Sequence, residues 1–345
     1  MLQTPVALII FNRPDTTARV FAEIAKARPS KLFVVADGPR SDRPREAERC
    51  DEARAIVDRV DWDCEVHKNY SAVNLGCGRR PATGISWVFE QVEEAIILED
   101  DCVPHPTFFR FCEELLEKYR QDERVMCISG INLASSHKAR SFSYRFSRLN
   151  LCWGWASWRR AWQHFDVTLK RWPALRDTQW LVDILEDQRA IGAYKGVFDR
   201  AFMQQGEVDY WDYQWTFACW AQKGLSIVPG TALVANVGFG EEATHTRSVN
   251  DPRARFAARG MRFPLVHPPD LAVDRKADRR LIRQITLFNQ GPKNTGYDRF
   301  RKPWNDILIR HPSLKSPRAL FRRLGERASA AIAWAARKAM VSLDE

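Results

Sequence analysis

The sequence predicts an α/β protein in which a mainly parallel central sheet carries helices on both faces. Strand patterns at residues 5–11, 32–36, roughly 64–68 and 95–98 alternate with segments of helical periodicity. This alternation favours parallel strands that are joined by crossover helices. Polar residues follow three of the four strands, and open sheets of this kind bind ligands beyond the carboxyl ends of their strands.

The first two connecting segments have helix signals. After the first strand, Asn12 or Asp15 can cap a helix, and Pro14 suits its first turn. Between the second and third strands, residues 44–60 place apolar side chains on one helical face. We expect that face to contain Ala47, Cys50, Ala53, Val57 and Val60.

The third connection begins with a glycine-rich segment, NLGCGRRPATG, at residues 74–84. We expect this segment to be a loop that leads to a helix containing Trp87, Val88 and Val92. The second half of the chain is looser in pattern and rich in tryptophan, whose rings offer flat faces to sugars. Its expected elements are a helix near 106–121, a strand at 125–132, a helix at 212–223 ending at Gly224, strands at 225–228 and 233–237, and a loop at 238–246.

Length and composition exclude several classes of protein. With 345 residues, of which 45% are hydrophobic, the chain can form a normal packed core. The apolar run in MLQTPVALIIFNRP is too short for a signal peptide and lacks a basic leader, so we expect a cytoplasmic protein. The eight cysteines show neither a CxxC pair nor zinc-ligand spacing, and we expect reduced, mostly buried thiols.

Positive charge is concentrated in the last hundred residues. Residues 246–345 contain 22 basic and 9 acidic residues, whereas residues 1–245 contain 31 and 34. Such a tail suits an anionic surface, either phospholipid or nucleic acid, and a solvated arginine-rich helix is an equally good interpretation. Within it, residues 316–342 predict a basic amphipathic helix.

Three carboxylates, Glu99, Asp100 and Asp101, directly follow the apolar run at 95–98. Adjacent like charges repel and burial penalises each of them, so the cluster needs a positive partner. Oxygen ligands favour hard cations such as Mn²⁺ or Mg²⁺, which keep coordination positions open for phosphate oxygens. We therefore predict a metal ion that holds a diphosphate here. An acidic surface turn is the simpler alternative.

Polar residues at the other strand ends suit a nucleotide. Asp37 follows the second strand, where a carboxylate can accept from a ribose hydroxyl or a base N–H, although Asp-Gly-Pro is also an ordinary turn. Arg13 can meet a base or a phosphate, or be solvated. Arg79 and Arg80 lie in the glycine-rich segment, where they can contact phosphate or belong to a solvated loop.

A group-transfer reaction needs a base for the incoming hydroxyl. In YWDYQW, residues 210–215, Asp212 has aromatic neighbours, and a carboxylate enclosed by aromatic surface tends toward a raised pKa. Asp209 is the rival base, and Asp212 is alternatively a helix N-cap. His245, in EEATHT, is a candidate metal ligand or phosphate contact, or a polar loop residue.

These segments together resemble glycosyltransferases of the GT-A fold, and they are closest to the N-acetylglucosaminyltransferase I-like family and its bacterial relatives. The resemblance spans roughly residues 4–250. It rests on PVALIIFNRP, VVADGPR, SWVFEQVEEAIILEDDCVPHPTFFRF, ISGIN, CWGWASW and WDYQW followed by GLSIVPG. The carboxylate block with its following apolar helix is the most specific part.

The resemblance implies an inverting transfer of sugar from a nucleotide-diphosphate donor, usually a UDP-sugar, with Mn²⁺. The roles carried over by position are metal binding for Asp101, contact with donor sugar and ribose for Glu99 and Asp100, uridine binding for Arg13 and Asp37, and general base for Asp212. The match departs from the family near Gly84, where a loop histidine is replaced, and after residue 250.

On this basis residues 1–250 form a GT-A glycosyltransferase domain, with a nucleotide-binding half at 1–132 and an acceptor half at 133–250. Residues 251–345 form a basic, mostly helical extension. The expected partners are a nucleotide-sugar donor and a glycan or glycolipid acceptor in bacterial surface polysaccharide synthesis. Residues 316–342 would hold the protein at the inner face of the membrane, and nucleic acid is not an expected partner.

Three other classes of function agree less well with the sequence. A sugar nucleotidyltransferase shares the broad fold but would carry a glycine-rich phosphate loop after the first strand, where this chain has FNRPDTT. A dinucleotide-binding oxidoreductase would need GxGxxG there. A nucleotide-sugar-binding or membrane-associated protein on a degenerate GT-A scaffold, without transferase activity, has the basic tail as its only support.

Overall fold

In the computed structural model, the chain divides into two compact units, Met1–Gly291 and Pro292–Glu345. The structure describes residues 1–133, 141–240, 254 and 256–288, all of which belong to the first unit. His245 and the predicted helix at 316–342 therefore lie outside the described residues, and the predictions made for them stay predictions.

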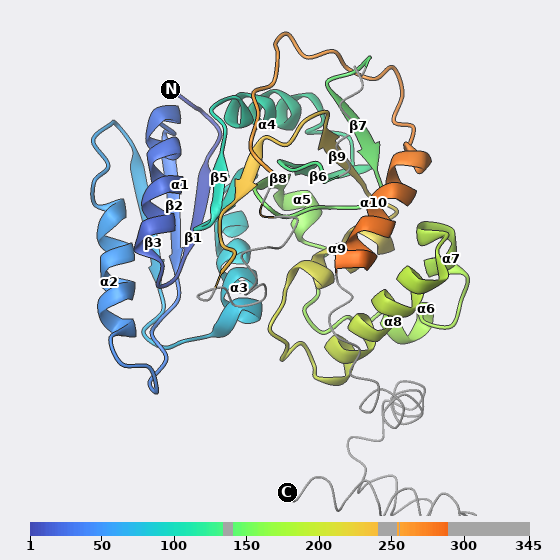
Figure 1. The fold of residues 1–345 in the computed structure, drawn as a ribbon, viewed down its shortest axis with the longest axis horizontal. Helices are drawn as coiled ribbons and strands as arrows, with labels where there is room; N and C mark the ends of the chain where they lie inside the picture. The colour runs from blue at the N-terminus through green and yellow to red at the C-terminus, as the bar shows by residue number, and fades with distance from the viewer. Residues whose placement is uncertain (134–140, 241–253, 255, 289–345) are drawn as a thin grey trace, which may run out of the picture. The chain divides into compact units, whose positions relative to one another are not determined.

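An eight-stranded sheet forms the centre of the first unit (Figure 1). Its strands are β1 (Val6–Ile10), β2 (Lys31–Ala36), β3 (Glu65–Tyr70), β4 (Glu94–Glu99), β6 (Val125–Ser129), β7 (Tyr144–Ser147), β8 (Trp155–Trp158) and β9 (Leu225–Pro229), while β5 (Cys102–Pro104) and β10 (Val234–Asn236) form a separate pair. The order in the large sheet is β3-β2-β1-β4-β8-β6-β9-β7. Because β8 and β7 alone in this sheet run against the other strands, the prediction of a mainly parallel sheet is confirmed.

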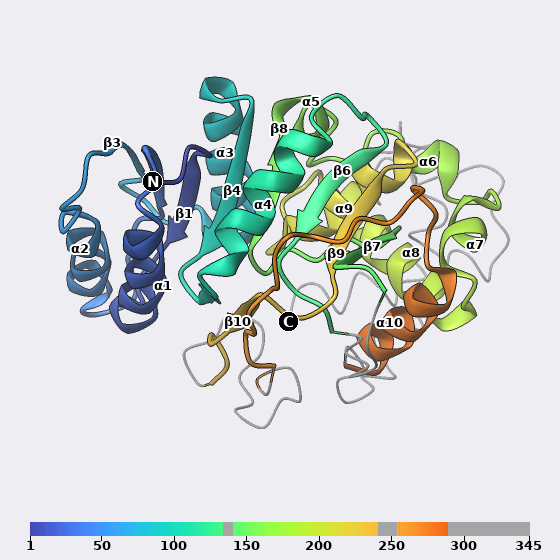
Figure 2. The same cartoon turned by 90° about the horizontal axis from the view of Figure 1, so that it is seen from above.

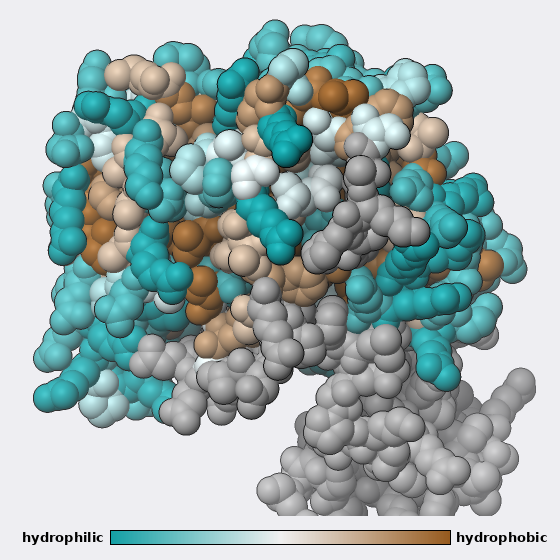
Figure 3. Space-filling view, turned by 45° about the horizontal axis from the view of Figure 1, so that its top comes forward, coloured by the Kyte–Doolittle hydropathy of each residue, from teal (hydrophilic) through white to brown (hydrophobic). Residues whose placement is uncertain are grey.

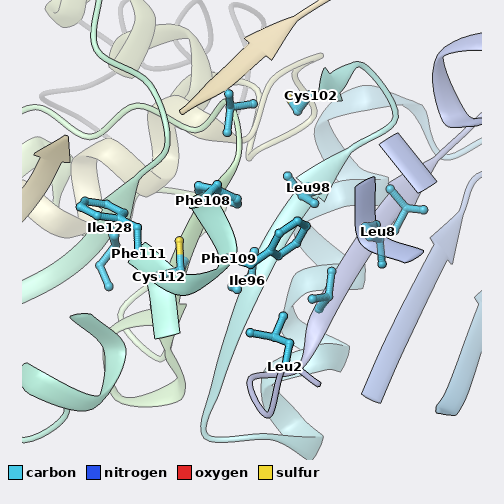
Figure 4. Packing of buried hydrophobic residues seen from close by; sticks show 14 of the residues in the cluster. Leu2, Leu8, Ile96, Leu98, Cys102, Phe108, Phe109, Phe111, Cys112 and Ile128 are labelled. Atoms are coloured by element: carbon cyan, nitrogen blue, oxygen red, sulfur yellow. The ribbon is translucent and has the colours of Figure 1, made fainter. Parts of the chain in front are cut away.

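Helices cover both faces of this sheet, as predicted. They are α1 (Pro14–Ala27), α2 (Glu46–Val57) and α4 (Thr107–Lys118) on one face, and α3 (Gly76–Gln91), α5 (Arg159–Trp162) and α9 (Asp212–Ala221) on the other. Successive side chains of a strand point to opposite faces, so Leu8 of β1 packs in the first core cluster and Ile9 in the second. Figure 4 shows part of the first cluster, and Figure 2 shows α1 and α2 across the sheet from α3.

The start of α1 differs from the prediction. Pro14 is the first helical residue, as expected, but neither Asn12 nor Asp15 caps the helix. Arg13 is the N-cap residue, and its side chain makes no capping hydrogen bond. Asn12 instead donates from Nδ2 to Glu46 Oε1 at 2.8 Å, because the chain after β1 turns toward α2.

Helix α2 confirms the second predicted helix, and its buried face agrees with the expected one except near the start of the helix. Cys50, Ala53 and Val57 are buried as expected, whereas Ala47 is exposed. Glu46 is buried in its place, and its carboxylate also accepts a hydrogen bond from Arg40 N at 2.7 Å. A paired acidic side chain therefore stands where the pattern predicted an apolar contact.

The glycine-rich segment is helical rather than a loop, since α3 already begins at Gly76. A Cβ atom on Gly78 would lie 2.0 Å from the carbonyl oxygen of Val208, and one on Gly84 would lie 2.2 Å from Val35 Cγ1. Glycine disfavours helices in isolation, which explains the prediction of a loop. Here the glycines permit the close approach of α3 to its neighbours.

The tryptophan-rich part of the chain builds a third core cluster beside the sheet. It packs α6 (Trp172–Leu175), α7 (Trp180–Leu185) and α8 (Gln188–Met203) against α9. Asp199 of α8 accepts from Trp172 Nε1 at 2.8 Å and from Arg176 Nε at 2.7 Å. This buried charge is therefore paired, and the tryptophan serves the core.

A last helix, α10 (Arg275–Phe288), packs against α8 within the first unit. Its Asp278 accepts from Arg145 Nη1 at 2.8 Å, from Ser147 Oγ at 2.6 Å and from Arg148 N at 2.9 Å. These bonds fasten α10 to β7. The predicted boundary between domain and extension falls in an undescribed range and stays a prediction.

Two expectations from composition can be compared with the structure. The eight cysteines are free thiols and five of them are buried, as predicted. Among the described residues, no helix has the length and apolar character needed to cross a membrane.

A chain of hydrogen bonds fastens the segment that precedes α10. The hydroxyl oxygens of Tyr119 and Tyr144 lie 2.6 Å apart, and Tyr144 Oη lies 2.9 Å from His267 Nδ1. On its other side, His267 Nε2 lies 3.5 Å from Glu114 Oε1. Burial and the positive charge of Lys118 lower the pKa of His267, although Glu114 opposes them. The neutral imidazole therefore fits this position best.

We expect acid to destabilise the fold through His267. A histidine whose pKa is lowered on folding stabilises the protein above its ordinary pKa of about 6.5, and this contribution is lost as the pH falls below that value. The melting temperature of the wild type should thus fall more between about pH 7.5 and about pH 5.5 than that of His267→Asn, which keeps an acceptor but does not titrate. His164→Asn, at an exposed position, is the control. Identical pH profiles for wild type and His267→Asn would contradict this role.

Candidate functional site

The predicted polar clusters meet at the carboxyl ends of β1, β2 and β4. Strand β1 lies between the other two and is parallel to both, with Ile10 opposite Ala36 and Ile9 opposite Glu99. Residues that directly follow these strands therefore share one edge of the sheet. We use the name β4 crevice for this edge of the sheet, and the residues that belong to it are Arg13 after β1, Asp37 after β2, and Glu99, Asp100 and Asp101 at the end of β4.

Arg13 joins the ends of β1 and β4 through both aspartates. Its Nη2 atom contacts Asp100 Oδ1 and lies 3.0 Å from Asp101 Oδ2. Asp100 is buried and also accepts from Phe11 N at 3.3 Å, so the cluster is not an exposed acidic turn. Burial lowers the pKa of Arg13, but the negative charges of Asp100 and Asp101 outweigh it and raise the pKa.

The carboxylates of the crevice carry more negative charge than Arg13 balances. Burial raises the pKa of Glu99 to about 8, with contributions from Asp101, Asp100 and Asp212 and against the effect of Arg13. Burial likewise raises the pKa of Asp100 to about 6, although Arg13 lowers it. A further positive charge at this place would favour the ionised carboxylates.

The β5–β10 pair holds Asp101 from the other side, which the sequence did not predict. Val237 N donates to the Asp101 carbonyl oxygen at 2.8 Å, and Asn236 Nδ2 donates to Asp101 Oδ1 at 3.3 Å. Asn236 Oδ1 in turn accepts from Gly238 N at 2.8 Å. The last residue of β10 thus orients the carboxylate that was predicted to bind a metal.

Gly238 is also needed for its lack of a side chain. A Cβ atom there would lie 2.0 Å from Asp101 Oδ2 and 2.8 Å from Arg13 Nη1. The sequence predicted a loop at this residue. The glycine pair in GFG, directly after a predicted strand, was the available signal of a close backbone approach.

Asp37 anchors the start of α3. Its Oδ1 accepts from the N–H groups of Gly38 at 2.9 Å and Leu75 at 2.8 Å, and its Oδ2 accepts from Gly76 N at 2.9 Å and Asn74 Nδ2 at 3.1 Å. Burial raises the pKa of Asp37, although the backbone hydrogen bonds lower it. A carboxylate offers about four lone-pair sites, so these donors fill its capacity. A contact with ribose or base stays a prediction and would compete with them.

Arg79 and Arg80 have different surroundings on α3. Arg80 is buried, and it donates from Nε to the Ala36 carbonyl at 3.0 Å and from Nη2 to Asn69 Oδ1 at 2.9 Å. It therefore ties α3 to the ends of β2 and β3. Arg79 is exposed near the start of the helix, so it is the better placed of the two for a ligand.

Asp212 lies within electrostatic reach of the β4 crevice. Its charge adds to burial in raising the pKa of Glu99, and together with Asp209 it adds to burial in raising the pKa of Cys77 at the start of α3. Asp212 is the first residue of α9, after the N-cap residue Trp211, and it is exposed. The predicted enclosure by aromatic surface is therefore wrong, and so is the alternative N-cap role.

The rival base, Asp209, is exposed and lies against the start of α3. Its carbonyl oxygen accepts from Cys77 Sγ at 2.8 Å.

The neighbouring tryptophans are core residues. Trp155, Trp162, Trp211 and Trp215 are all buried, and their ring centroids lie between 5.1 Å and 6.2 Å apart where they contact one another. Their faces are covered by one another, so they fix the start of α9 and do not offer flat surfaces to a sugar.

A metal ion fits this site on the chemistry of its donors. In the described ranges, no group of three or more His, Cys, Asp or Glu residues is arranged to hold a metal ion, and His245 lies outside them. A cation that is shared with substrate phosphates needs one or two protein carboxylates. Asp101 suits this kind of site, since its side chain is 14% exposed and its neighbours repel.

Comparisons with known proteins give structural likenesses at low identity. No family model and no curated protein matches the sequence. A mannosyltransferase from Pyrobaculum calidifontis, in complex with GDP-Man and Mn²⁺, is 11% identical over 63% of this chain and 70% of its own, with a TM-score of 0.36. A UDP-glucose pyrophosphorylase complexed with UDP-glucose is 11% identical over 42% of this chain and 62% of its own, with a TM-score of 0.25.

A third similar structure is the 4-diphosphocytidyl-2C-methyl-D-erythritol synthase from Anaerococcus prevotii. It is 12% identical over 47% of this chain and 74% of its own, with a TM-score of 0.27. The match to the pyrophosphorylase spans 62% of that protein's length, which is less than two thirds. The fold is defined here by strand order and direction rather than by these likenesses.

We expect Asp37→Ala to lower the free energy of unfolding by about 2 kcal/mol, because a lost helix cap costs about 1 kcal/mol and unsatisfied buried N–H groups add to it. Urea denaturation of the free protein measures this change. Asp42→Ala, at an exposed position in the following loop, is the control and should change stability by less than about 0.5 kcal/mol. An Asp37→Ala variant as stable as the wild type would show that the carboxylate does not hold α3.

Proposed function

We propose that this protein is a metal-dependent, inverting glycosyltransferase. In this proposal it moves a sugar from a nucleotide-diphosphate donor, a UDP-sugar, to a glycan or glycolipid acceptor in bacterial surface polysaccharide synthesis. The observation that carries the proposal is the group of carboxylates at the end of β4, which repel one another and are balanced in part by Arg13. Such a site favours a divalent cation together with a diphosphate.

The donor would bind in the β4 crevice, where open α/β sheets bind their ligands. Asp101 would hold Mn²⁺ or Mg²⁺, while Glu99 and Asp100 would contact donor sugar and ribose. When bound, the cation neutralises the negative charge of the diphosphate leaving group. Arg13 keeps both aspartates in position, and Asp37 keeps the start of α3 beside the crevice.

Arg79 is our candidate for a phosphate contact, because it is exposed near the start of α3. Arg13 reaches the same crevice, but its guanidinium is already shared between Asp100 and Asp101. Uridine binding by Arg13 would therefore have to use donors that these ion pairs leave over.

Asp212 is the proposed general base. It is exposed at the start of α9, and its charge reaches Glu99. As the acceptor hydroxyl oxygen attacks the anomeric carbon, Asp212 takes its proton, and the bond between that carbon and the diphosphate breaks. Asp209 is the rival for this role. Attack from the side opposite the leaving group inverts the anomeric centre.

Replacing Asp101 should remove Mn²⁺-dependent binding of UDP. In the wild type, UDP and Mn²⁺ together should raise the melting temperature, because a ligand that binds only the native state stabilises it. Asp101→Ala should lose this shift, and Gly238→Ala should weaken it, since the added methyl group collides with Asp101.

Asp63→Ala, at an exposed position before β3, is the matched control and should respond as the wild type does. A shift of unchanged size in Asp101→Ala would remove this residue from the metal site. A panel of UDP-, GDP- and dTDP-sugars, each with and without Mn²⁺, identifies the donor for the assay below.

Asp212→Asn should lower donor turnover by about 10²–10⁴-fold, as expected for loss of a general base. Release of UDP measures this turnover, and the thermal shift with UDP and Mn²⁺ should stay at its wild-type value. Asp209→Asn is the matched variant and should keep most of the activity. Full activity in Asp212→Asn with loss in Asp209→Asn would reverse the assignment, and donor binding without any turnover in the wild type would favour a non-enzymatic binding protein.

A further inference from the structure

Helix α10 presents a row of three basic side chains. Lys276, Arg280 and Arg283 follow one another at four and three positions, so they lie on one face of the helix. All three are exposed, and none forms an ion pair with another residue in the part of the chain that the structure describes. We call them the α10 basic row. Figure 3 shows hydrophilic side chains gathered on the side of the molecule where α10 lies.

The opposite face of α10 is fixed, so the helix cannot turn this row inward. Leu281 and Ile282 are buried in the third core cluster. Asp278, the acidic residue of the helix, is buried and paired with Arg145 at 2.8 Å. Its charge is therefore used within the fold and does not neutralise the basic row.

Two further basic residues on the same helix form ion pairs with one acidic residue, which distinguishes them from the α10 basic row. Arg275 Nη1 lies 3.2 Å from Glu186 Oε1, and Arg279 Nη1 lies 3.0 Å from Glu186 Oε2. The fold thus supplies an acidic residue for one side of α10 and leaves the adjoining side positively charged.

Two exposed apolar side chains lie near β7, which is the edge strand of the sheet next to α10. Phe142 and Val266 are 39% and 52% exposed, and the residues are joined by hydrogen bonds of Ser143 with the Val266 backbone at 2.8 Å and 2.9 Å. From Val266 the chain runs along β7 to Val273, which pairs with Phe146 just before α10. Apolar and cationic groups therefore follow one another along this edge.

We propose that the α10 basic row binds the surface of an anionic phospholipid bilayer. Each Lys or Arg near such a surface strengthens binding by about fivefold, so three together give about a hundredfold. Interfacial binding adds burial of apolar groups to this attraction, as Phe142 and Val266 would provide. An exposed valine has no part in the phosphate contacts that dominate nucleic-acid binding, which favours lipid as the partner. This surface is independent of the proposed reaction.

The test is sedimentation of the full-length protein with vesicles of phosphatidylcholine that contain about 30% phosphatidylglycerol, and with vesicles of phosphatidylcholine alone. The variant is Lys276→Glu/Arg280→Glu/Arg283→Glu. Its control, Arg19→Glu/Arg43→Glu/Arg59→Glu, makes the same change in net charge at exposed positions near α1 and α2. Circular dichroism melting verifies that both variants fold.

We expect the α10 variant to lose at least about tenfold in partitioning to anionic vesicles, and the control to lose less than about twofold. Arg280→Lys/Arg283→Lys keeps the charge and should bind as the wild type does. Equal losses in the two triple variants, or no loss in the α10 variant, would overturn the proposal. So would a loss of duplex DNA binding in the α10 variant without a change in vesicle binding.

Discussion

The ion pairs of Arg13 with Asp100 and Asp101 are the interaction on which the candidate site depends. They join the ends of two adjacent parallel strands, β1 and β4, and they keep a buried aspartate charged. One guanidinium shared by two carboxylates leaves negative charge in excess, and Glu99 responds with a pKa raised by burial and by its acidic neighbours. The same arrangement that orders the crevice therefore also makes it attract a cation.

Buried acidic residues in this protein differ in how their charge is met. Asp37, Asp199 and Asp278 each accept several hydrogen bonds from protein donors, and each fastens one helix to the rest of the core. Glu99, which is half-buried, instead lies within electrostatic reach of Asp100, Asp101 and Asp212. Repulsion of this kind costs stability and serves no packing purpose, which is why we assign chemistry to Glu99 and its neighbours and structure to the others.

Periodicity and strand-end chemistry were enough to predict the parallel half of the sheet and to bring Arg13, Asp37 and the β4 carboxylates to one edge. The features of the site that were not predicted depend on contacts between segments that are far apart in the sequence. The capping of α3 by Asp37 spans 38 positions to Leu75, and the orientation of Asp101 by Asn236 spans 135, so neither leaves a local pattern.

Local composition also misled the prediction in two places. The glycines within α3 suggested a loop, because their helix propensity is low, whereas in the fold two of them admit Val208 and Val35 at close range. The aromatic residues around Asp212 suggested enclosure, but they pack inward and leave the carboxylate exposed. In both cases tertiary packing, which a single sequence does not display, decided the outcome.

The order of strands separates the two surfaces to which we assign binding. Between β4, which ends in the carboxylates, and β7, which carries α10 on its flank, lie β8, β6 and β9. Four strand spacings of about 4.8 Å correspond to about 19 Å across the sheet. A bilayer in contact with α10 would thus meet the sheet at its β7 edge, away from the carboxylates at the end of β4.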